Sequence, residues 1–255
     1  MKCTSDCALS WNACDVAWRD HALSMDTFGL LRQHMLAEVA AQTIYASAQI
    51  GKAALAKPVL DAMGSVPRHE FVPVELQPYA YANTPLPIGF DKTISQPFIV
   101  ALMTDLLDLN ATDAVLEVGT GLGYQSAILA QLARKVYSVE IIEELARQAE
   151  QRLGRLGYTN IELKIGNGYY GWPEYAPFDK VIVTAAPDLI PPQLIQQLKP
   201  EGRMVIPAGL SGEQQLMLAT KQRDGKLTIT KILPVRFSTL EGDESSGSGD
   251  SRSTL

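Results

Sequence analysis

Short apolar runs alternate with longer, more polar segments through the second half of the chain. Residues 115–118 and 178–184 have the length and continuous hydrophobicity of buried strands, and residues 143–156 have the charged, periodic pattern of a surface helix. Further strands are predicted at residues 135–140, 161–165 and 202–207, a helix at residues 192–198, and a hairpin at residues 215–220 and 227–233 around the turn Arg223-Asp224-Gly225. This alternation predicts an α/β fold with a mostly parallel sheet and a C-terminal antiparallel hairpin.

The first half of the chain is predicted to be mainly helical. Residues 1–28 show no clear period and are expected to form an N-terminal extension without regular structure. From Leu30 onward, apolar residues recur at helical spacing and predict an amphipathic helix. A second short helix is predicted at residues 58–64 and another at residues 97–107, while the prolines of residues 66–73 favour an extended segment between them.

Length and composition favour one domain. A chain of 255 residues with 46% hydrophobic content can bury a full core, and single α/β domains often reach this size. We expect this domain, with its N-terminal helices, to span residues 29–240. Residues 241–255 are rich in Glu, Asp, Gly and Ser, cannot bury apolar surface, and are predicted to be a disordered tail.

Charge and cysteine usage narrow the class of partner. The formal net charge is −6 without any block of Lys or Arg, which argues against a nucleic-acid partner. No stretch approaches membrane-spanning length, so no membrane partner is expected. The three cysteines, Cys3, Cys7 and Cys14, lack the spacing of a metal site or a disulfide framework. We therefore expect a cytoplasmic protein that acts on a protein or small-molecule substrate.

The segment from Val115 to Tyr124 has the pattern of a buried strand that enters a glycine turn and then a helix. Gly119, Gly121 and Gly123 allow the backbone to turn sharply and to lie against a ligand. Their spacing differs from the G-x-G-x-x-G dinucleotide fingerprint, and the acidic Glu117 disfavours a pyrophosphate but can lie near a cationic cofactor. S-adenosyl-L-methionine fits best. The alternative is a glycine turn that only packs a helix against the sheet.

A second acidic residue supports a nucleoside-containing cofactor. Glu140 ends the strand predicted at residues 135–140, about 20 residues after the glycines, where a carboxylate accepts hydrogen bonds from ribose hydroxyls. A glutamate at a strand end is more commonly a solvated charge or a helix cap. Its place after a glycine turn favours the ribose role.

Several unusual segments share one order with a known family. They are Thr93-Ile-Ser-Gln-Pro97 followed by Phe-Ile-Val-Ala-Leu-Met, Leu116 to Gln125, Gly168-Tyr-Tyr-Gly-Trp-Pro173, Phe178-Asp179, Val183-Thr-Ala-Ala-Pro187 and Pro234-Val-Arg-Phe237. Together they resemble the protein-L-isoaspartate O-methyltransferases. The resemblance implies a Rossmann-like class I methyltransferase fold, S-adenosyl-L-methionine as methyl donor, and the free carboxylate of isoaspartyl residues in damaged proteins as acceptor.

The resemblance also implies roles for two further residues. It places Ser95 at the active site, where a hydroxyl can donate a hydrogen bond to the acceptor carboxylate. It places Asn167 beside the adenine, because Gly166-Asn167-Gly168 stands where the family usually has Gly-Asp-Gly. No general base is expected, since a carboxylate is already a nucleophile at neutral pH. The alternative for Ser95 is a cap on the helix predicted from Pro97.

The loop before Ser95 departs from the family pattern. Gly89-Phe90-Asp91-Lys92-Thr93 stands where Gly-x-Gly-Gln-Thr is common, and we expect Lys92 to face the acceptor and Asp91 to face solvent. The departure leaves two alternatives open, a carboxyl methyltransferase for one dedicated peptide and a non-catalytic S-adenosyl-L-methionine-binding adaptor. Ser95 argues against the adaptor, and the altered loop argues for it.

Overall fold

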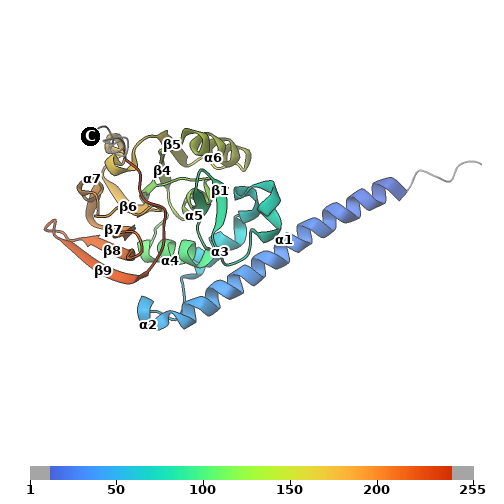
Figure 1. Ribbon diagram of the computed structural model, residues 1–255, viewed down its shortest axis with the longest axis horizontal. Coiled ribbons are helices and arrows are strands. Elements are labelled where there is room, and N and C mark those ends of the chain that lie inside the picture. The colour runs from blue at the N-terminus through green and yellow to red at the C-terminus, as the bar shows by residue number, and fades with distance from the viewer. Residues whose placement is uncertain (1–11, 243–255) are drawn as a thin grey trace, which may run out of the picture.

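The computed structural model describes the backbone of residues 12–242 and the side chains of residues 27–242. Its centre is a seven-stranded sheet of order β5-β4-β3-β6-β7-β8-β9 (Figure 1). The strands are β3 (Ala114–Val118), β4 (Lys135–Glu140), β5 (Ile161–Ile165), β6 (Phe178–Val183), β7 (Leu198–Ala208), β8 (Gln215–Lys221) and β9 (Leu227–Pro234). The pairs from β5 to β7 are parallel, and β7–β8 and β8–β9 are antiparallel. The predicted mostly parallel sheet with a C-terminal antiparallel hairpin is confirmed.

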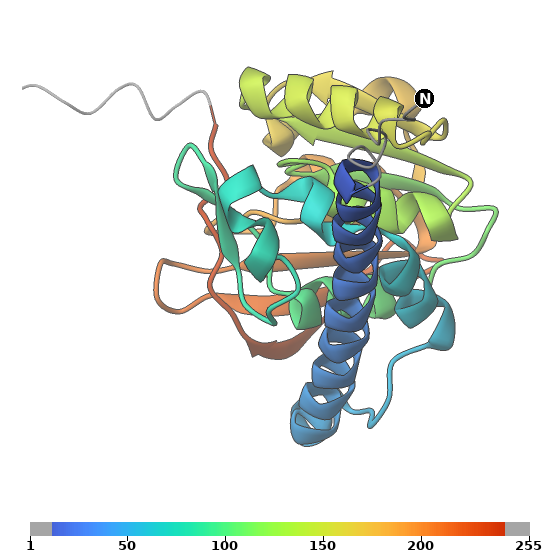
Figure 2. The ribbon, with the colours of Figure 1, turned by 90° about the vertical axis from the view of Figure 1, so that its right-hand side faces the viewer.

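Helices bury both faces of this sheet. They are α1 (Asn12–Tyr45), α2 (Ser47–Ile50), α3 (Lys57–Ser65), α4 (Pro97–Leu107), α5 (Tyr124–Leu132), α6 (Glu143–Arg155) and α7 (Pro192–Gln196), with the short 3-10 helices η1 (Arg68–Phe71), η2 (Val74–Tyr79), η3 (Gly168–Tyr170) and η4 (Pro173–Tyr175). Successive residues of β3 point to opposite faces, so Val115 packs in the core with α3, α4 and α5, and Leu116 packs in the core with α7. Figure 2 shows α1 along one side of the domain, where it contacts α3 and α4.

Two expectations for the N-terminal half are wrong. The sequence predicts a helix from Leu30, but the backbone is already helical from Asn12, so residues 12–28 are not an irregular segment. Apolar residues at helical spacing show only the part of a helix that packs against a core. They therefore do not show where a helix begins if its first turns extend beyond the core. The segment 66–73, expected to be extended, contains η1. The remainder of the predicted extension, residues 1–11, lies outside the described chain.

A small hairpin precedes α4 and was not predicted. It pairs β1 (Leu86–Gly89) with β2 (Lys92–Ile94) through a two-residue turn. The turn residues Phe90 and Asp91 have φ angles of 53° and 54°, in the left-handed region. Such turns usually contain Asn or Gly, so the sequence lacks the ordinary hairpin signal. The hairpin delivers Ser95 to the carboxyl edge of the main sheet.

Residues 235–242, which we call the C-terminal strap, return from β9 across that same edge. The amide of Ala186 donates to the carbonyl of Ser238 at 2.8 Å, and the amide of Leu240 donates to the carbonyl of Ala186 at 2.9 Å. Glu241, predicted to begin the tail, instead forms an ion pair with Lys92 of β2. The rest of the predicted tail, residues 243–255, lies outside the described chain. Within residues 12–242, no helix combines the length and hydrophobicity needed to span a membrane.

Candidate active site

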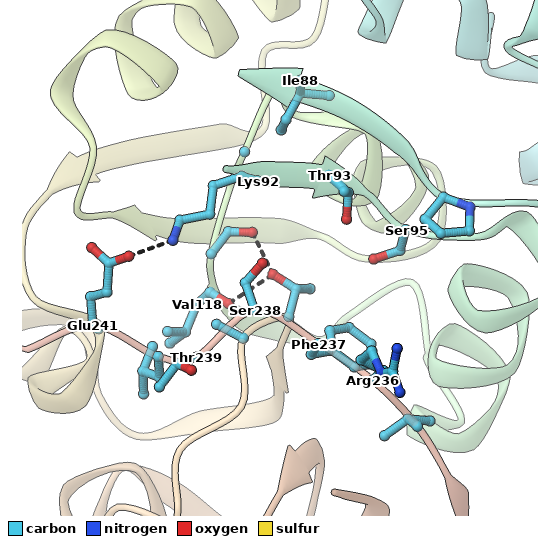
Figure 3. A pocket seen from close by; sticks show the side chains of 18 of the residues that line it. Ile88, Lys92, Thr93, Ser95, Val118, Arg236, Phe237, Ser238, Thr239 and Glu241 are labelled. Carbon is cyan, nitrogen blue, oxygen red and sulfur yellow. Dashed lines mark hydrogen bonds and ion pairs between the residues drawn. The ribbon is translucent and has the colours of Figure 1, made fainter. Parts of the chain in front are cut away.

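A pocket of about 580 Å³ opens at the carboxyl edge of the sheet (Figure 3). The ends of β3, β4 and β6, the β1–β2 hairpin and the C-terminal strap form its wall. The parallel strand order reverses here, because β4 lies on one side of β3 and β6 lies on the other. Open parallel sheets bind their ligands at such switch points, and this volume is in the usual range for small-molecule sites.

The glycine turn after β3 lies against one side of the pocket. Gly119 and Gly121 have φ angles of 95° and 56°, and both line the wall. A Cβ atom on Gly119 would lie 2.4 Å from Oγ1 of Thr184, so a larger residue does not fit without a shift. Oγ1 of Thr184 also donates to the carbonyl of Gly119 at 2.6 Å. These contacts fix the turn against the end of β6.

Glu140 is buried at the end of β4 and lines the pocket. Its Oε2 accepts a hydrogen bond from the amide of Gly121 at 2.8 Å, and its Oε1 accepts from the amide of Ile142 at 3.0 Å. A carboxylate has about four lone-pair directions, so two backbone bonds leave acceptor capacity for a ligand. Glu140 therefore tethers the glycine turn and stays available for hydroxyl groups in the pocket.

Ser95 joins β2 to α4 and lines the same pocket. Figure 3 shows Thr93 and Ser95 extending from this segment into the cavity. The N-cap of α4 is Gln96, whose side chain makes no capping bond, and the amide of Phe98 in the first turn donates to Oδ1 of Asn83 at 3.0 Å. The helix-cap alternative for Ser95 is therefore wrong. Within residues 27–242, the Ser95 hydroxyl has no hydrogen-bond partner, which leaves it available to a ligand.

Glu117, predicted to be near the cofactor, lies outside the pocket wall. It is fully buried beneath the glycine turn, where the hydroxyls of Ser126 and Ser138 both donate to its Oε2. Burial raises the pKa of Glu117 to about 7, the two serines oppose this shift, and the nearby Glu140 adds to it. Period-two alternation points this side chain into the core face that holds α5, so a direct cofactor contact is not supported.

Gly123 and Asn167 also lie outside the pocket wall. A Cβ atom on Gly123 would lie 3.1 Å from Cδ1 of Leu153, so this glycine permits α6 to pack against the start of α5. The Oδ1 atom of Asn167 accepts a hydrogen bond from the amide of Tyr169 at 2.9 Å and thereby caps η3. Its neighbour Gly168 lines the pocket instead. Sequence spacing located both segments but not which of their residues line the cavity.

The pocket has charged groups at both ends. Lys92 lines the wall and forms an ion pair with Glu241, which Figure 3 shows at the end of the cavity away from Arg236. Arg236 of the strap also lines the wall and has no carboxylate partner among residues 27–242. Asp91 is exposed, as expected. Lys92 lines the pocket, but its ammonium points to Glu241 rather than toward Ser95, and its contact with the acceptor stays a prediction.

Comparison with known proteins gives the family. The family model for protein-L-isoaspartate(D-aspartate) O-methyltransferases matches residues 41–245. The chain belongs to this family. Protein-L-isoaspartate O-methyltransferase 1 of Polaromonas sp. strain JS666 is 68% identical over 217 residues, which cover 85% of this chain and 92% of that protein. Its namesake from Cupriavidus necator is 52% identical over 230 residues, covering 90% and 87%.

Solved structures of family members show the same fold. A protein-L-isoaspartate O-methyltransferase with 29% identity aligns with a TM-score of 0.72 and covers 83% of this chain, which in turn spans 66% of that one. A putative Plasmodium falciparum member, solved with S-adenosyl-L-homocysteine, aligns with a TM-score of 0.70 at 22% identity and covers 82% and 98% of the two chains. The predicted Rossmann-like methyltransferase fold is confirmed.

The family segments visible in the sequence account for most of the pocket. Ser95, Gly119, Gly121 and Glu140, which the sequence singled out, come together in the wall. Sequence reasoning missed Thr184 and Arg236. Both lie in quoted family segments, 183–187 and 234–237, so the signal was present without a role attached to the individual side chains.

Proposed function

We propose that the protein transfers a methyl group from S-adenosyl-L-methionine to the free carboxylate of L-isoaspartyl residues in damaged proteins. The observation that carries this proposal is one pocket lined both by the glycine turn with Glu140 and by Ser95. A cofactor on the glycine turn and an acceptor at Ser95 therefore share one cavity. The names of the family and of its relatives support the same reaction.

The side chains around the glycine turn fit this cofactor. Glu140 offers carboxylate oxygens to ribose hydroxyls, and the turn presents backbone rather than bulky side chains. The cationic residues of the pocket, Lys92 and Arg236, belong to the hairpin and the strap. The glycine turn itself carries no basic side chain, whereas a pyrophosphate bound there would favour one. When bound, S-adenosyl-L-methionine supplies a methyl group already activated on a sulfonium.

The acceptor end needs few catalytic groups. The Ser95 hydroxyl donates to one oxygen of the acceptor carboxylate and orients the other, while the charge of Arg236 attracts the anion. A carboxylate needs no deprotonation at neutral pH, and no histidine within residues 27–242 lines the pocket. Positioning in a partly dehydrated cavity then provides most of the rate acceleration.

The resulting ester explains how methylation leads to repair. The nitrogen of the following backbone amide attacks the ester carbonyl and closes a succinimide, and the methoxide leaves with the amide proton as methanol. Hydrolysis of the succinimide gives either aspartyl or isoaspartyl peptide, and repeated methylation drains the isoaspartyl form.

The structure weakens the argument for a non-catalytic adaptor. The altered segment Phe90-Asp91-Lys92, which favours the adaptor in the sequence, forms a hairpin turn whose lysine contacts the strap. This segment does not block the pocket, and Ser95 still lines it. A methyltransferase for one dedicated peptide has the same pocket and is distinguished by experiment.

Two measurements test the proposal. Unrelated isoaspartyl peptides with different flanking residues should all be methylated with kcat/KM values within about tenfold of one another. The enzyme should contact mainly the isoaspartyl group, so the activation barrier should depend little on the flanking residues. Activity on one peptide alone would favour the dedicated enzyme, and absence of activity with cofactor bound would favour the adaptor.

Substituting the serine tests the acceptor site. Ser95→Ala should lower kcat/KM for the peptide by roughly tenfold or more, because one hydrogen bond to a charged group is lost, while the affinity for S-adenosyl-L-homocysteine changes little. Ser65→Ala is the matched control, because Ser65 is an exposed serine at the end of α3 and does not line the pocket. Loss of cofactor affinity in Ser95→Ala would instead make the serine structural.

The cellular setting is also part of this proposal. A cytoplasmic location and the lack of a nucleic-acid partner stay predictions that rest on the sequence, on its cysteine usage and on the formal net charge of −6. Isoaspartyl-containing proteins are the expected partners.

A further inference from the structure

Arg68 is a fully buried cation behind the active site. It lies in η1, has no exposed surface, and is the bulkiest of the completely buried side chains in the described chain. No carboxylate within residues 27–242 pairs with it, and its Nη1 has no hydrogen-bond partner there. Burial lowers the pKa of its guanidinium, which the neighbouring Tyr124 opposes. An unpaired buried charge disfavours folding, so stability alone does not explain this residue.

The guanidinium contacts three segments that meet at the pocket. Its Nε donates to the carbonyl of Ala80 at 2.8 Å, and its Nη2 donates to the carbonyl of Ser95 at 2.7 Å. Ala80 precedes the β1–β2 hairpin and Ser95 follows it, so one planar group joins both ends of the hairpin segment. The same guanidinium lies 4.7 Å from the ring centroid of Tyr124, the first residue of α5 after the glycine turn.

We propose that Arg68 is a positioning residue that fixes the Ser95 hydroxyl relative to the glycine turn. Arg68 does not line the pocket, so it acts through the backbone of Ser95 and the ring of Tyr124 rather than by touching a ligand. This inference rests on the proposed function, in which Ser95 orients the acceptor carboxylate.

The geometry requires arginine in particular. A guanidinium donates from a rigid plane to two carbonyls at once and stacks on an aromatic face, whereas a lysine ammonium is a single point charge. Phe71 packs edge-on against Tyr124 at 5.6 Å and holds that ring in place. Arg68→Lys therefore keeps the charge and loses the connection between Ala80, Ser95 and Tyr124.

A double-mutant cycle tests this inference on the full chain with an isoaspartyl peptide. Arg68→Lys should lower kcat by about 10- to 100-fold, because a misplacement of about 1 Å costs up to ~10²-fold in rate. The Kd of S-adenosyl-L-homocysteine should stay within about threefold of wild type, since the glycine turn keeps its contacts with Glu140 and Thr184. In the Ser95→Ala variant, Arg68→Lys should lower kcat by less than about a further twofold, because the hydroxyl that Arg68 positions is already absent.

Arg32→Lys is the matched control. Arg32 is a part-buried arginine that donates to the carbonyl of Gly64 and to the hydroxyl of Tyr81, and it does not line the pocket. Its substitution should leave kcat unchanged. If Arg68→Lys does not fold, Arg68→Met serves in the same cycle, since it keeps a long side chain and removes the desolvation cost of the buried charge.

Two outcomes overturn the inference. One is an unchanged kcat in the folded Arg68 variant, and the other is an equal loss in the wild-type and Ser95→Ala backgrounds, which would make Arg68 purely structural. Failure of the proposed function has a different signature, the absence of isoaspartyl methylation in the wild-type protein.

Discussion

Glu140 combines two roles at the edge of the pocket, and its environment explains both. The backbone amides of Gly121 and Ile142 hold its carboxylate in place, and the remaining lone pairs face the cavity. The sequence predicted the ligand role from spacing alone. It did not predict the structural role, because the bond to Gly121 depends on how closely β3 and β4 lie in space.

Substitution of Glu140 should weaken cofactor binding. Glu140→Ala removes a charge-assisted acceptor and releases Gly121, so we expect a loss of about 1.5–3 kcal/mol in the binding free energy of S-adenosyl-L-homocysteine. Glu140→Gln keeps one acceptor oxygen and should lose less. Calorimetric titration measures both, and unchanged affinity in Glu140→Ala would contradict the ribose role.

Glu117 makes the stability of the protein depend on pH. Its pKa is about 7 in the folded protein, against an ordinary value of 4.5. Between these values the unfolded chain releases a proton that the folded protein retains, so the free energy of unfolding falls as pH rises through this window and levels above it. The shift corresponds to a change on the order of 3 kcal/mol.

Glu117→Gln removes this titration. The variant should show a flatter dependence of unfolding free energy on pH between pH 4.5 and 7 than the wild type, measured by urea unfolding at several pH values. Glu75→Gln, on an exposed surface, is the control and should keep the wild-type slope. Equal slopes in wild type and Glu117→Gln would show that the buried carboxyl does not titrate in this range.

Among the secondary-structure elements, agreement with the sequence is best where the local residue pattern is regular. The buried helix at 97–107, the strand at 135–140 and even the half-buried strand at 161–165 have the predicted bounds. The β1–β2 hairpin was missed because its turn uses Phe90 and Asp91 in left-handed conformations. The C-terminal strap was missed in part because its contacts, such as Lys92 with Glu241, join residues far apart in the sequence.

The Lys92–Glu241 ion pair should mainly hold the strap in place rather than bind the acceptor directly. If it serves to hold the strap over the pocket, Lys92→Ala and Glu241→Ala should raise the peptide KM by similar amounts, about two- to fivefold, because a partly exposed ion pair contributes at most about 1 kcal/mol. The double variant should add little further. Steady-state kinetics measures these effects, with exposed Asp91→Ala as the control.

Opposite effects of the two substitutions on the peptide KM would favour a direct role of Lys92 in acceptor binding. If Lys92→Ala raises the peptide KM and Glu241→Ala lowers it, then the lysine attracts the acceptor carboxylate directly and Glu241 competes for it. The strap would then have no part in acceptor binding through this pair.

The strand order of the sheet determines the position of the pocket. The parallel strands reverse their order between β3 and β6, and their carboxyl ends bring the glycine turn, Glu140 and Thr184 to one edge. The hairpin and the strap then cover this edge from two sides and contribute Ser95 and Arg236. The sequence predicted the layered fold and the cofactor end, while the acceptor end was reached only through the family resemblance.

We expect the protein to methylate isoaspartyl carboxylates in preference to ordinary aspartyl ones. The most direct test compares initial rates of methyl transfer to an isoaspartyl peptide and to its aspartyl twin of the same sequence, at equal concentrations of S-adenosyl-L-methionine. The isoaspartyl peptide should be methylated rapidly, and the rate for its twin should be lower by about 100-fold or more, a difference of about 2.7 kcal/mol in the transition-state barrier. Equal rates for the two peptides would show that the pocket does not recognise the isoaspartyl linkage.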